Sequence, residues 1–155
     1  MNEALAIPEA HSGAKRAVDL IARATRAEIS ALWQDGEGPP LASLLRGPET
    51  GLVMVQWRIG GGGAPFNMGE VTVSRCSVRL ASGTIGHAQA LGTDREKARL
   101  GAIAHALWQE GTSRERVEQV LLAPVEARLA DEHQRKSEET AATRVDFFTM
   151  VRGED

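Results

Sequence analysis

The sequence feature that most constrains the fold is a long central stretch, Leu52–Leu91, in which no run of residues has the spacing of a helix. At its start, apolar side chains occupy alternate positions, at Val53, Val55, Trp57 and Ile59. In an extended chain such side chains share one face, so the pattern predicts a half-buried β-strand. We therefore expect an antiparallel sheet around which the rest of the chain is arranged.

A second predicted strand changes its apolar face part-way along. Its apolar positions are Val71 and Val73 and, with the opposite parity, Cys76, Val78 and Leu80. A strand exchanges its buried face only through an extra residue, so this pattern predicts a β-bulge near Ser74–Arg75. A short turn at Ala81–Gly83 then leads into a further strand.

One more strand is expected at Leu41–Arg46. The residues that follow, Gly47-Pro48-Glu49-Thr50-Gly51, have the composition of a turn and stand directly before the first alternating run, which favours a hairpin. The predicted sheet therefore has four antiparallel strands. They are Leu41–Arg46, Leu52–Ile59, Gly69–Leu80 and Thr84–Leu91.

Helices are expected on both sides of these strands, so the predicted fold class is α+β. One helix begins near Ala14, and the capping-box pattern at Thr25–Glu28 begins a second. A similar pattern at Thr93–Glu96 begins the helix Thr93–Glu110, which has an apolar stripe along one face. Pro124 is expected to interrupt the helical region that follows and to start a new helix.

The last predicted helix, Val125–Thr140, is charged on nearly all sides and has little apolar surface to bury. We expect it to project from the body as an arm. An extended apolar tail follows it and needs a surface to cover it. The expected organisation is a flexible N-terminus at 1–12, a single α+β domain with its C-terminal helix at 13–143, and a partner-docking tail at 144–155.

Composition excludes several classes of function. The chain has 155 residues and a formal net charge of −3, so it carries neither the basic surface typical of nucleic-acid binding nor a polybasic membrane patch. Cys76 is the single cysteine, which rules out a disulfide framework and is expected to be a buried apolar residue. With no signal-peptide pattern or apolar span, we expect a cytoplasmic protein without nucleic-acid or membrane partners.

No pattern of catalytic or metal-ligating residues stands out. The four histidines lie in separate predicted elements without metal-ligand spacing, and no nucleophile motif is present. The glycines at Gly60–Gly63 lack the Lys-Ser/Thr and the helix that a phosphate-binding loop requires, so a connection between strands is expected. Residues of a possible site or interface are Glu70, Arg75, Gly61 and Gly62. We expect no catalytic residue, no metal and no cofactor bound by this chain.

Three stretches together resemble the G subunit of the bacterial carbon–phosphorus lyase core complex, the PhnG family. They are Pro48–Leu52 leading into the glycine run, Gly69–Cys76, and the tail Arg144–Gly153. The tail, with sequence RVDFFTMVRG, is the most specific of the three. The resemblance covers the chain from about Lys15 onward.

The resemblance implies an α-D-ribose 1-methylphosphonate 5-triphosphate synthase, in which a phosphonate displaces adenine from ATP. It implies H, I and L subunits as partners in that transfer, with ATP as a substrate of the complex, and a J subunit that later cuts the carbon–phosphorus bond. It assigns no catalytic residue to the G subunit. Partner binding is expected in the tail, at Arg144, Val145, Asp146, Phe147, Phe148, Met150 and Arg152.

Three hypotheses of function remain open at this point. The first is an essential, non-catalytic subunit of a transferase complex. The second is an autonomous small-molecule enzyme with a site near Glu70 and Arg75. The third is a general binding or regulatory module, which the pair of N-terminal helices supports only weakly.

Overall fold

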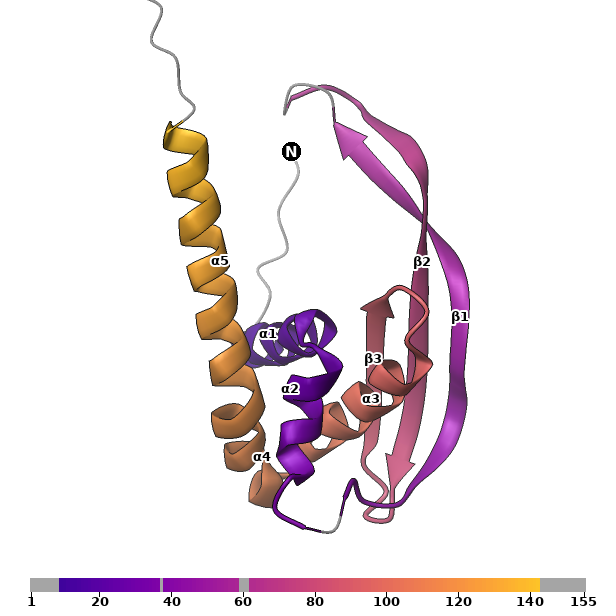
Figure 1. Cartoon of the computed structure of the whole chain (residues 1–155). Helices are drawn as coiled ribbons and strands as arrows, with labels where there is room; N and C mark the ends of the chain where they lie inside the picture. Colours follow the sequence, from indigo (N-terminus) through magenta and orange to yellow (C-terminus); the bar gives the residue numbers. More distant parts are fainter. Residues whose placement is uncertain (1–8, 37, 59–61, 143–155) are drawn as a thin grey trace, which may run out of the picture.

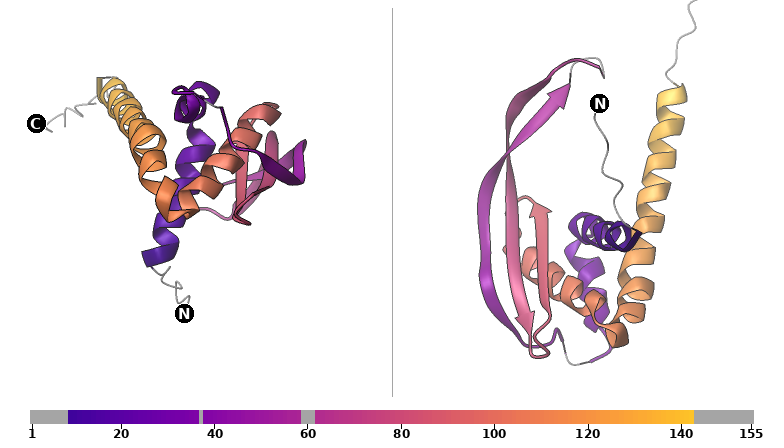
Figure 2. Two further views of the ribbon diagram at one scale, coloured as in Figure 1. Left: turned by 90° about the horizontal axis from the view of Figure 1, so that it is seen from below. Right: turned by 180° about the vertical axis from the view of Figure 1, so that it is seen from behind.

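The computed structural model describes residues 9–36, 38–58 and 62–142 of the chain. A three-stranded antiparallel sheet forms one layer, and the helices cover one of its faces (Figure 1). The views from below and from behind place every helix on that same side of the sheet (Figure 2). The α+β class expected from the sequence is confirmed.

The strands are β1 (Ala42–Arg58), β2 (Pro65–Leu80) and β3 (Ile85–Leu91), in the order β1-β2-β3. The expectation of four strands is wrong, because the two predicted strands on either side of Gly47-Pro48 are parts of β1. Both sides of this dipeptide pair with β2, Arg46 with Ser77 and Glu49 with Arg75. The turn-like residues therefore form an irregularity within one strand rather than a hairpin.

Gly47 explains why the strand can continue through this irregularity. Its φ of 70° lies in the left-handed region that glycine tolerates. A Cβ atom at this position would lie 2.6 Å from the carbonyl oxygen of Arg75, so the two strands approach too closely here for any larger residue. The same backbone freedom that predicted a turn thus serves to keep β1 paired with β2.

The bulge predicted near Ser74–Arg75 is also wrong. The pairing of β2 with β3 is continuous from Val73 to Arg79, and the irregularities in the β1–β2 pairing lie between Leu44 and Glu49 and between Val55 and Gln56. The buried face of β2 does not change. Ser74 lies on the same face as Cys76 and is fully buried. Because Ser74 is polar, the pattern of apolar residues does not show that this face stays buried.

The helices are α1 (Glu9–Arg23), α2 (Arg26–Ser30), α3 (Arg95–Gln109), α4 (Gly111–Val117) and α5 (Ala123–Ala142). A 3₁₀ turn, Ala31–Trp33, follows α2. The capping box at Thr25 and Glu28 is present as predicted. At the start of α3, Asp94 is the N-cap and accepts a hydrogen bond from the Lys97 backbone N–H at 2.9 Å.

Pro124 does not separate two helices as expected. A π-helical segment, Glu118–Leu122, joins α4 directly to α5, and Pro124 lies in the first turn of α5. A proline ring clashes with the carbonyl four residues earlier in a regular α-helix, and a local π turn widens the helix at that point. The helical chain therefore continues through the proline.

The core lies between the sheet and the helices. It is built from the buried faces of β2 and β3 and from side chains of α1, α2, α3, the π-helical segment and α5. Ile29, Ile103, Leu121, Leu122 and Val125 are among its most deeply buried members. None of the described helices has both the length and the apolar composition needed to cross a membrane.

Candidate functional site

Glu70 and Arg75 are not brought together by the fold. They lie five positions apart on β2, with opposite parity, so their side chains leave opposite faces of the strand roughly 16 Å apart along it. Both residues are exposed, and Glu70 stands opposite Met54. The two residues do not form a common site.

Arg75 belongs instead to a small surface ion cluster. Its Nε donates to Oε1 of Glu49 at 2.7 Å, and Nε of Arg46 donates to the same oxygen at 2.7 Å. The hydrogen bond from Arg46, followed by that from Arg75, lowers the pKa of the Glu49 carboxyl. The cluster ties the irregular part of β1 to β2, which is a structural role.

The glycine run connects β1 to β2 directly, as the sequence predicted. Gly62 is exposed in the connecting turn, and Gly61 lies outside the described residues. A hollow of about 430 Å³ lies beside this end of the strands, lined among the described residues by Gln56, Trp57, Arg58 and Pro65. The glycines are followed by β2 and not by the helix whose N-terminus a phosphate-binding loop requires.

A serine–histidine pair, which the sequence pattern did not reveal, lies on the sheet surface. Ser77 Oγ is 2.8 Å from His87 Nδ1, and the His87 backbone N–H donates to His105 Nδ1 at 3.0 Å. This bond places the proton of neutral His105 on Nε2, and burial, followed by the charge of His87, lowers the pKa of His105. In the described part of the chain no carboxylate hydrogen-bonds either imidazole, so the orienting group of a catalytic triad is missing there.

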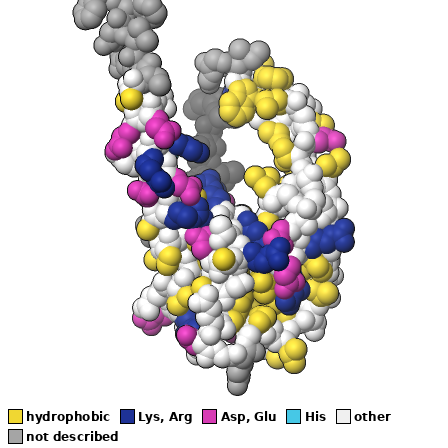
Figure 3. Space-filling model, viewed as in Figure 1, with side chains coloured by type: hydrophobic (Ala, Val, Ile, Leu, Met, Phe, Trp, Pro, Cys, Tyr) yellow, Lys and Arg dark blue, Asp and Glu magenta, His cyan; other side chains and the backbone are white. Residues whose placement is uncertain are grey.

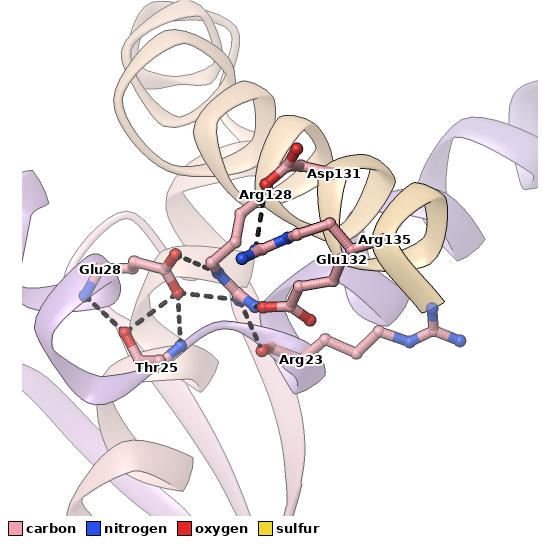
Figure 4. A network of polar contacts seen from close by, with 7 residues as sticks. All are labelled: Arg23, Thr25, Glu28, Arg128, Asp131, Glu132 and Arg135. Atoms are coloured by element: carbon pink, nitrogen blue, oxygen red, sulfur yellow. Dashed lines mark hydrogen bonds and ion pairs between the residues drawn. The ribbon is translucent and has the colours of Figure 1, made fainter. Parts of the chain in front are cut away.

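Ion pairs that join distant parts of the sequence fix the first half of α5. Arg128 Nε donates to Oε1 of Glu28 at 2.7 Å, and its other nitrogens reach Glu132 and the carbonyl of Arg23 (Figure 4). Glu28 also accepts from the backbone N–H and the hydroxyl of Thr25, so one carboxylate serves both the capping box and α5. The hydrogen bond from Arg128 lowers the pKa of Glu28.

A second network involves Glu126, two residues before Arg128 on α5, and Glu118 of the π-helical segment. Arg16 of α1 donates to Glu126 at 2.7 Å and to Glu118 at 3.0 Å, and the indole N–H of Trp108 donates to Glu118 at 2.7 Å. These bonds join α1, α3 and the π-helical segment to α5. From Asp131 onward α5 is almost entirely exposed, and it extends beyond the helical layer (Figure 1).

Apolar side chains that were expected to be half-buried are exposed along part of the sheet. We define the β-ribbon as Thr50–Arg58 of β1 together with Pro65–Val73 of β2. Within it Trp57 is 60% exposed and Val53 is 49% exposed, although their alternation had predicted a buried face. Hydrophobic side chains are visible along the upper part of this ribbon (Figure 3).

The described residues hold no group of three or more His, Cys, Asp or Glu side chains placed to bind a metal ion. The family model described as "Phosphonate metabolism protein PhnG" matches residues 14–153. The chain belongs to this family.

A curated relative from Rhizobium meliloti (strain 1021) is 60% identical over 136 residues, which span 88% of this chain and 86% of the relative. That relative is named alpha-D-ribose 1-methylphosphonate 5-triphosphate synthase subunit PhnG. The resemblance found in the sequence is thereby confirmed. The family match includes the tail Arg144–Gly153, whose predicted partner-binding residues lie outside the described part of the structure.

Proposed function

We propose that this protein is a subunit of an alpha-D-ribose 1-methylphosphonate 5-triphosphate synthase that acts in phosphonate metabolism. The observation that carries the proposal is the 60% identity, over 88% of the chain, to the Rhizobium meliloti protein of that name. The PhnG family match over residues 14–153 supports the same assignment for nearly the whole chain.

In the proposed reaction an oxygen of methylphosphonate attacks the anomeric carbon of the ribose of ATP. The bond from that carbon to adenine breaks, and adenine leaves and takes up a proton. The products are adenine and alpha-D-ribose 1-methylphosphonate 5-triphosphate. The chain acts here with H, I and L subunits, in the cytoplasm where ATP is made and held, and a J subunit cuts the carbon–phosphorus bond afterwards.

The contribution proposed for this chain is assembly rather than catalysis. In support, Glu70 and Arg75 lie on opposite faces of β2, and the Ser77–His87 pair has no carboxylate partner among the described residues. An acyl- or glycosyl-transfer site needs such groups within hydrogen-bond reach of one reacting atom. The separation of these side chains disfavours the alternative of an autonomous enzyme.

The tail is the first partner-binding segment in this proposal. Its residues are Arg144, Val145, Asp146, Phe147, Phe148, Met150 and Arg152. Burial of one large apolar side chain contributes roughly 1.5–3 kcal/mol. Three or four of them together contribute about 4.5–12 kcal/mol, which is comparable to an association cost of about 4–15 kcal/mol. The charged residues between them would fix the register of docking.

The proposal is tested by adenine release from ATP and methylphosphonate. The chain alone should release none, and the chain with its companion subunits should release adenine. Deletion of 144–155 should abolish both co-purification and adenine release, whereas Glu70→Gln and Arg75→Ala should preserve them. Adenine release by the isolated chain that either substitution abolishes would contradict the assembly role.

A further inference from the structure

The β-ribbon, Thr50–Arg58 with Pro65–Val73, extends beyond the part of the sheet that the helices cover. Strand β3 pairs with β2 only from Val73 to Arg79, so the ribbon has just two strands. Among the described strands, β1 has a neighbour on one side only, and so does β2 beyond Val73. An isolated two-stranded ribbon is marginally stable in water, and open strand edges attract other chains.

Most of the large apolar side chains of the ribbon are exposed to water. Seven of its large apolar side chains are between 37% and 65% exposed: Leu52, Val53, Met54, Trp57, Phe66, Met68 and Val71. An aromatic side chain presents about 150–250 Å² when fully exposed, so Trp57 and Phe66, at 60% and 41% exposed, together leave on the order of 200 Å² in water. The five aliphatic side chains add further apolar surface. Exposed apolar surface gathered on one element of a chain marks an interaction site.

This surface lies on both faces of the ribbon. Val53 stands opposite Val71, and Trp57 opposite Phe66, so these pairs share one face. Leu52 and Met54 alternate with them and point to the other face, which continues the buried face of Ser74. A partner that covers only one face would leave the other in water.

Charge is nearly absent from the ribbon, whose only ionisable side chains are Arg58 and Glu70. A nucleic acid or an acidic surface would have no cluster of cations to bind here. We propose that the β-ribbon inserts into an apolar groove of a different subunit of the synthase, which covers both of its faces. This inference rests on the function proposed above.

A second copy of this chain fits the ribbon less well. In a symmetric dimer the same patch meets itself, so a face-to-face contact through Trp57 and Phe66 would leave Leu52 and Met54 exposed. Pairing of two β1 edges would extend the sheet and leave both faces in water. Only a groove that encloses the ribbon buries both sets of side chains.

Two Leu→Lys substitutions make the test sharp. Leu52→Lys places a charge on the ribbon, where the side chain is 63% exposed, and Leu41→Lys places the same charge just before β1, at a side chain that is 93% exposed. Both positions tolerate lysine in the folded chain because both are open to water. Enclosing the ammonium group of a lysine in an apolar groove carries a desolvation cost that can exceed its attraction to the Glu70 carboxylate on the same face, so only Leu52→Lys should disturb an interface through the ribbon.

The experiment is co-purification of the companion synthase subunits with the tagged full-length chain. We expect wild type and Leu41→Lys to recover them equally, and Leu52→Lys to recover less by about tenfold or more. Trp57→Ser, on the opposite face, should give a comparable loss. Circular dichroism of both ribbon variants should match wild type, which shows that the loss reflects docking.

Amide hydrogen exchange gives a second readout that needs no substitution. Residues 50–58 and 65–73 should exchange more slowly in the assembled complex than in the isolated chain, while the core helices should change little. Equal recovery with Leu52→Lys and Trp57→Ser, or unchanged exchange in the ribbon, would overturn the inference and leave the proposed function intact. Self-association of the isolated chain that Leu52→Lys abolishes without loss of the companion subunits would assign the ribbon to a second copy instead. Failure of the wild-type chain to recover any companion subunit would overturn the proposed function as well.

Discussion

The close approach of α3 to β3 gives the sharpest prediction about the fold, because a single methyl group tests it. A Cβ atom on Gly86 would lie 2.0 Å from the carbonyl oxygen of Ala102 and 2.8 Å from the Cβ of Ala106. A comfortable carbon–oxygen contact is about 3.3 Å or more, so Gly86→Ala requires α3 and β3 to separate by more than about 1 Å. The carbonyl oxygen of Ala102 and the nitrogen of Ala106, at 2.7 Å, are helix backbone, and the Cβ of Ala106 is fixed to that backbone, so none of these atoms can rotate aside.

The expected cost follows from the packing that such a separation would disturb. Overpacking of a well-packed core costs typically about 1–3 kcal/mol, and a clash with backbone places Gly86→Ala at the upper end, about 3 kcal/mol. For a chain of this length that corresponds to a fall of roughly 6–12 °C in Tm. Thermal melts of the purified full-length chain, followed by circular dichroism, measure it.

Two further glycines provide matched controls for this variant. Gly51 lies in β1 with no atom near its would-be Cβ, so Gly51→Ala should leave Tm unchanged or slightly raised. A Cβ on Gly101 would have side-chain atoms as its nearest neighbours, of Ile21 at 3.0 Å, Ala88 at 3.1 Å and Ile29 at 3.9 Å. The helix propensity of alanine offsets about 1 kcal/mol of the cost of these contacts. If Gly86→Ala and Gly51→Ala had the same Tm, the close packing of α3 on β3 would be wrong.

Three other predictions concern α5 and the lone cysteine. Arg128 chiefly lowers the pKa of Glu28 in the folded chain, so the stabilising contribution of this carboxylate is present above its ordinary pKa and is lost as pH falls through the lowered value. Glu28→Gln should therefore destabilise the chain at pH 7, and its difference from wild type in urea unfolding should shrink as the pH is lowered below the ordinary pKa of glutamate. Leu121→Ala should cost about 2–5 kcal/mol because Leu121 is fully buried. Arg16→Met should cost no more than about 1 kcal/mol, since its ion pairs are partly exposed; an equal loss in the two variants would show that ion pairs rather than apolar packing hold α5. Burial raises the pKa of the Cys76 thiol, so native protein should react slowly with a thiol reagent at pH 7 and unfolded protein quickly, as mass spectrometry would show; fast labelling of the native chain would contradict the buried position.

Local signals in the sequence were sufficient for part of this fold. The capping box at Thr25 and Glu28 depends on residues three positions apart, so its geometry can be read without knowing the tertiary structure. At the start of α3 the predicted capping box is wrong, because Asp94 rather than Thr93 is the N-cap. Gly47-Pro48 shows where such reasoning fails. The same residues suit a tight turn and an irregularity within a strand, and only the pairing of both flanks with β2 decides between them.

Candidate site residues were harder to predict, because their roles depend on contacts between distant positions. Arg75 was predicted as a residue of a possible site or interface. Its ion pair with Glu49, 26 positions away in the sequence, gives it a structural role instead. The bond between Arg128 and Glu28 spans 100 positions and has no local sequence signal. The alternation at Val53 and Trp57 predicted a strand with an apolar face, yet alternation cannot tell whether the chain itself or another chain covers that face.

The apolar residues of the core and those of the β-ribbon are separate sets. No residue of the β-ribbon belongs to the core cluster, whose sheet residues run from Cys76 to Leu80 on β2 and include Ala88 on β3. Folding of the body therefore does not depend on the ribbon side chains, and a substitution such as Leu52→Lys removes no contact of the core. Hydrogen bonds hold the ribbon at the end where it leaves the sheet, with Ser74 bonded to Thr50 and to the carbonyl of Gly92. At the same end the Gly92 N–H donates to the carbonyl of Thr72, and Arg95 donates to the hydroxyl of Thr50. A two-stranded element that is held at one end and apolar on both faces acquires most of its order where it is enclosed, so docking and ordering of the ribbon are expected to occur together.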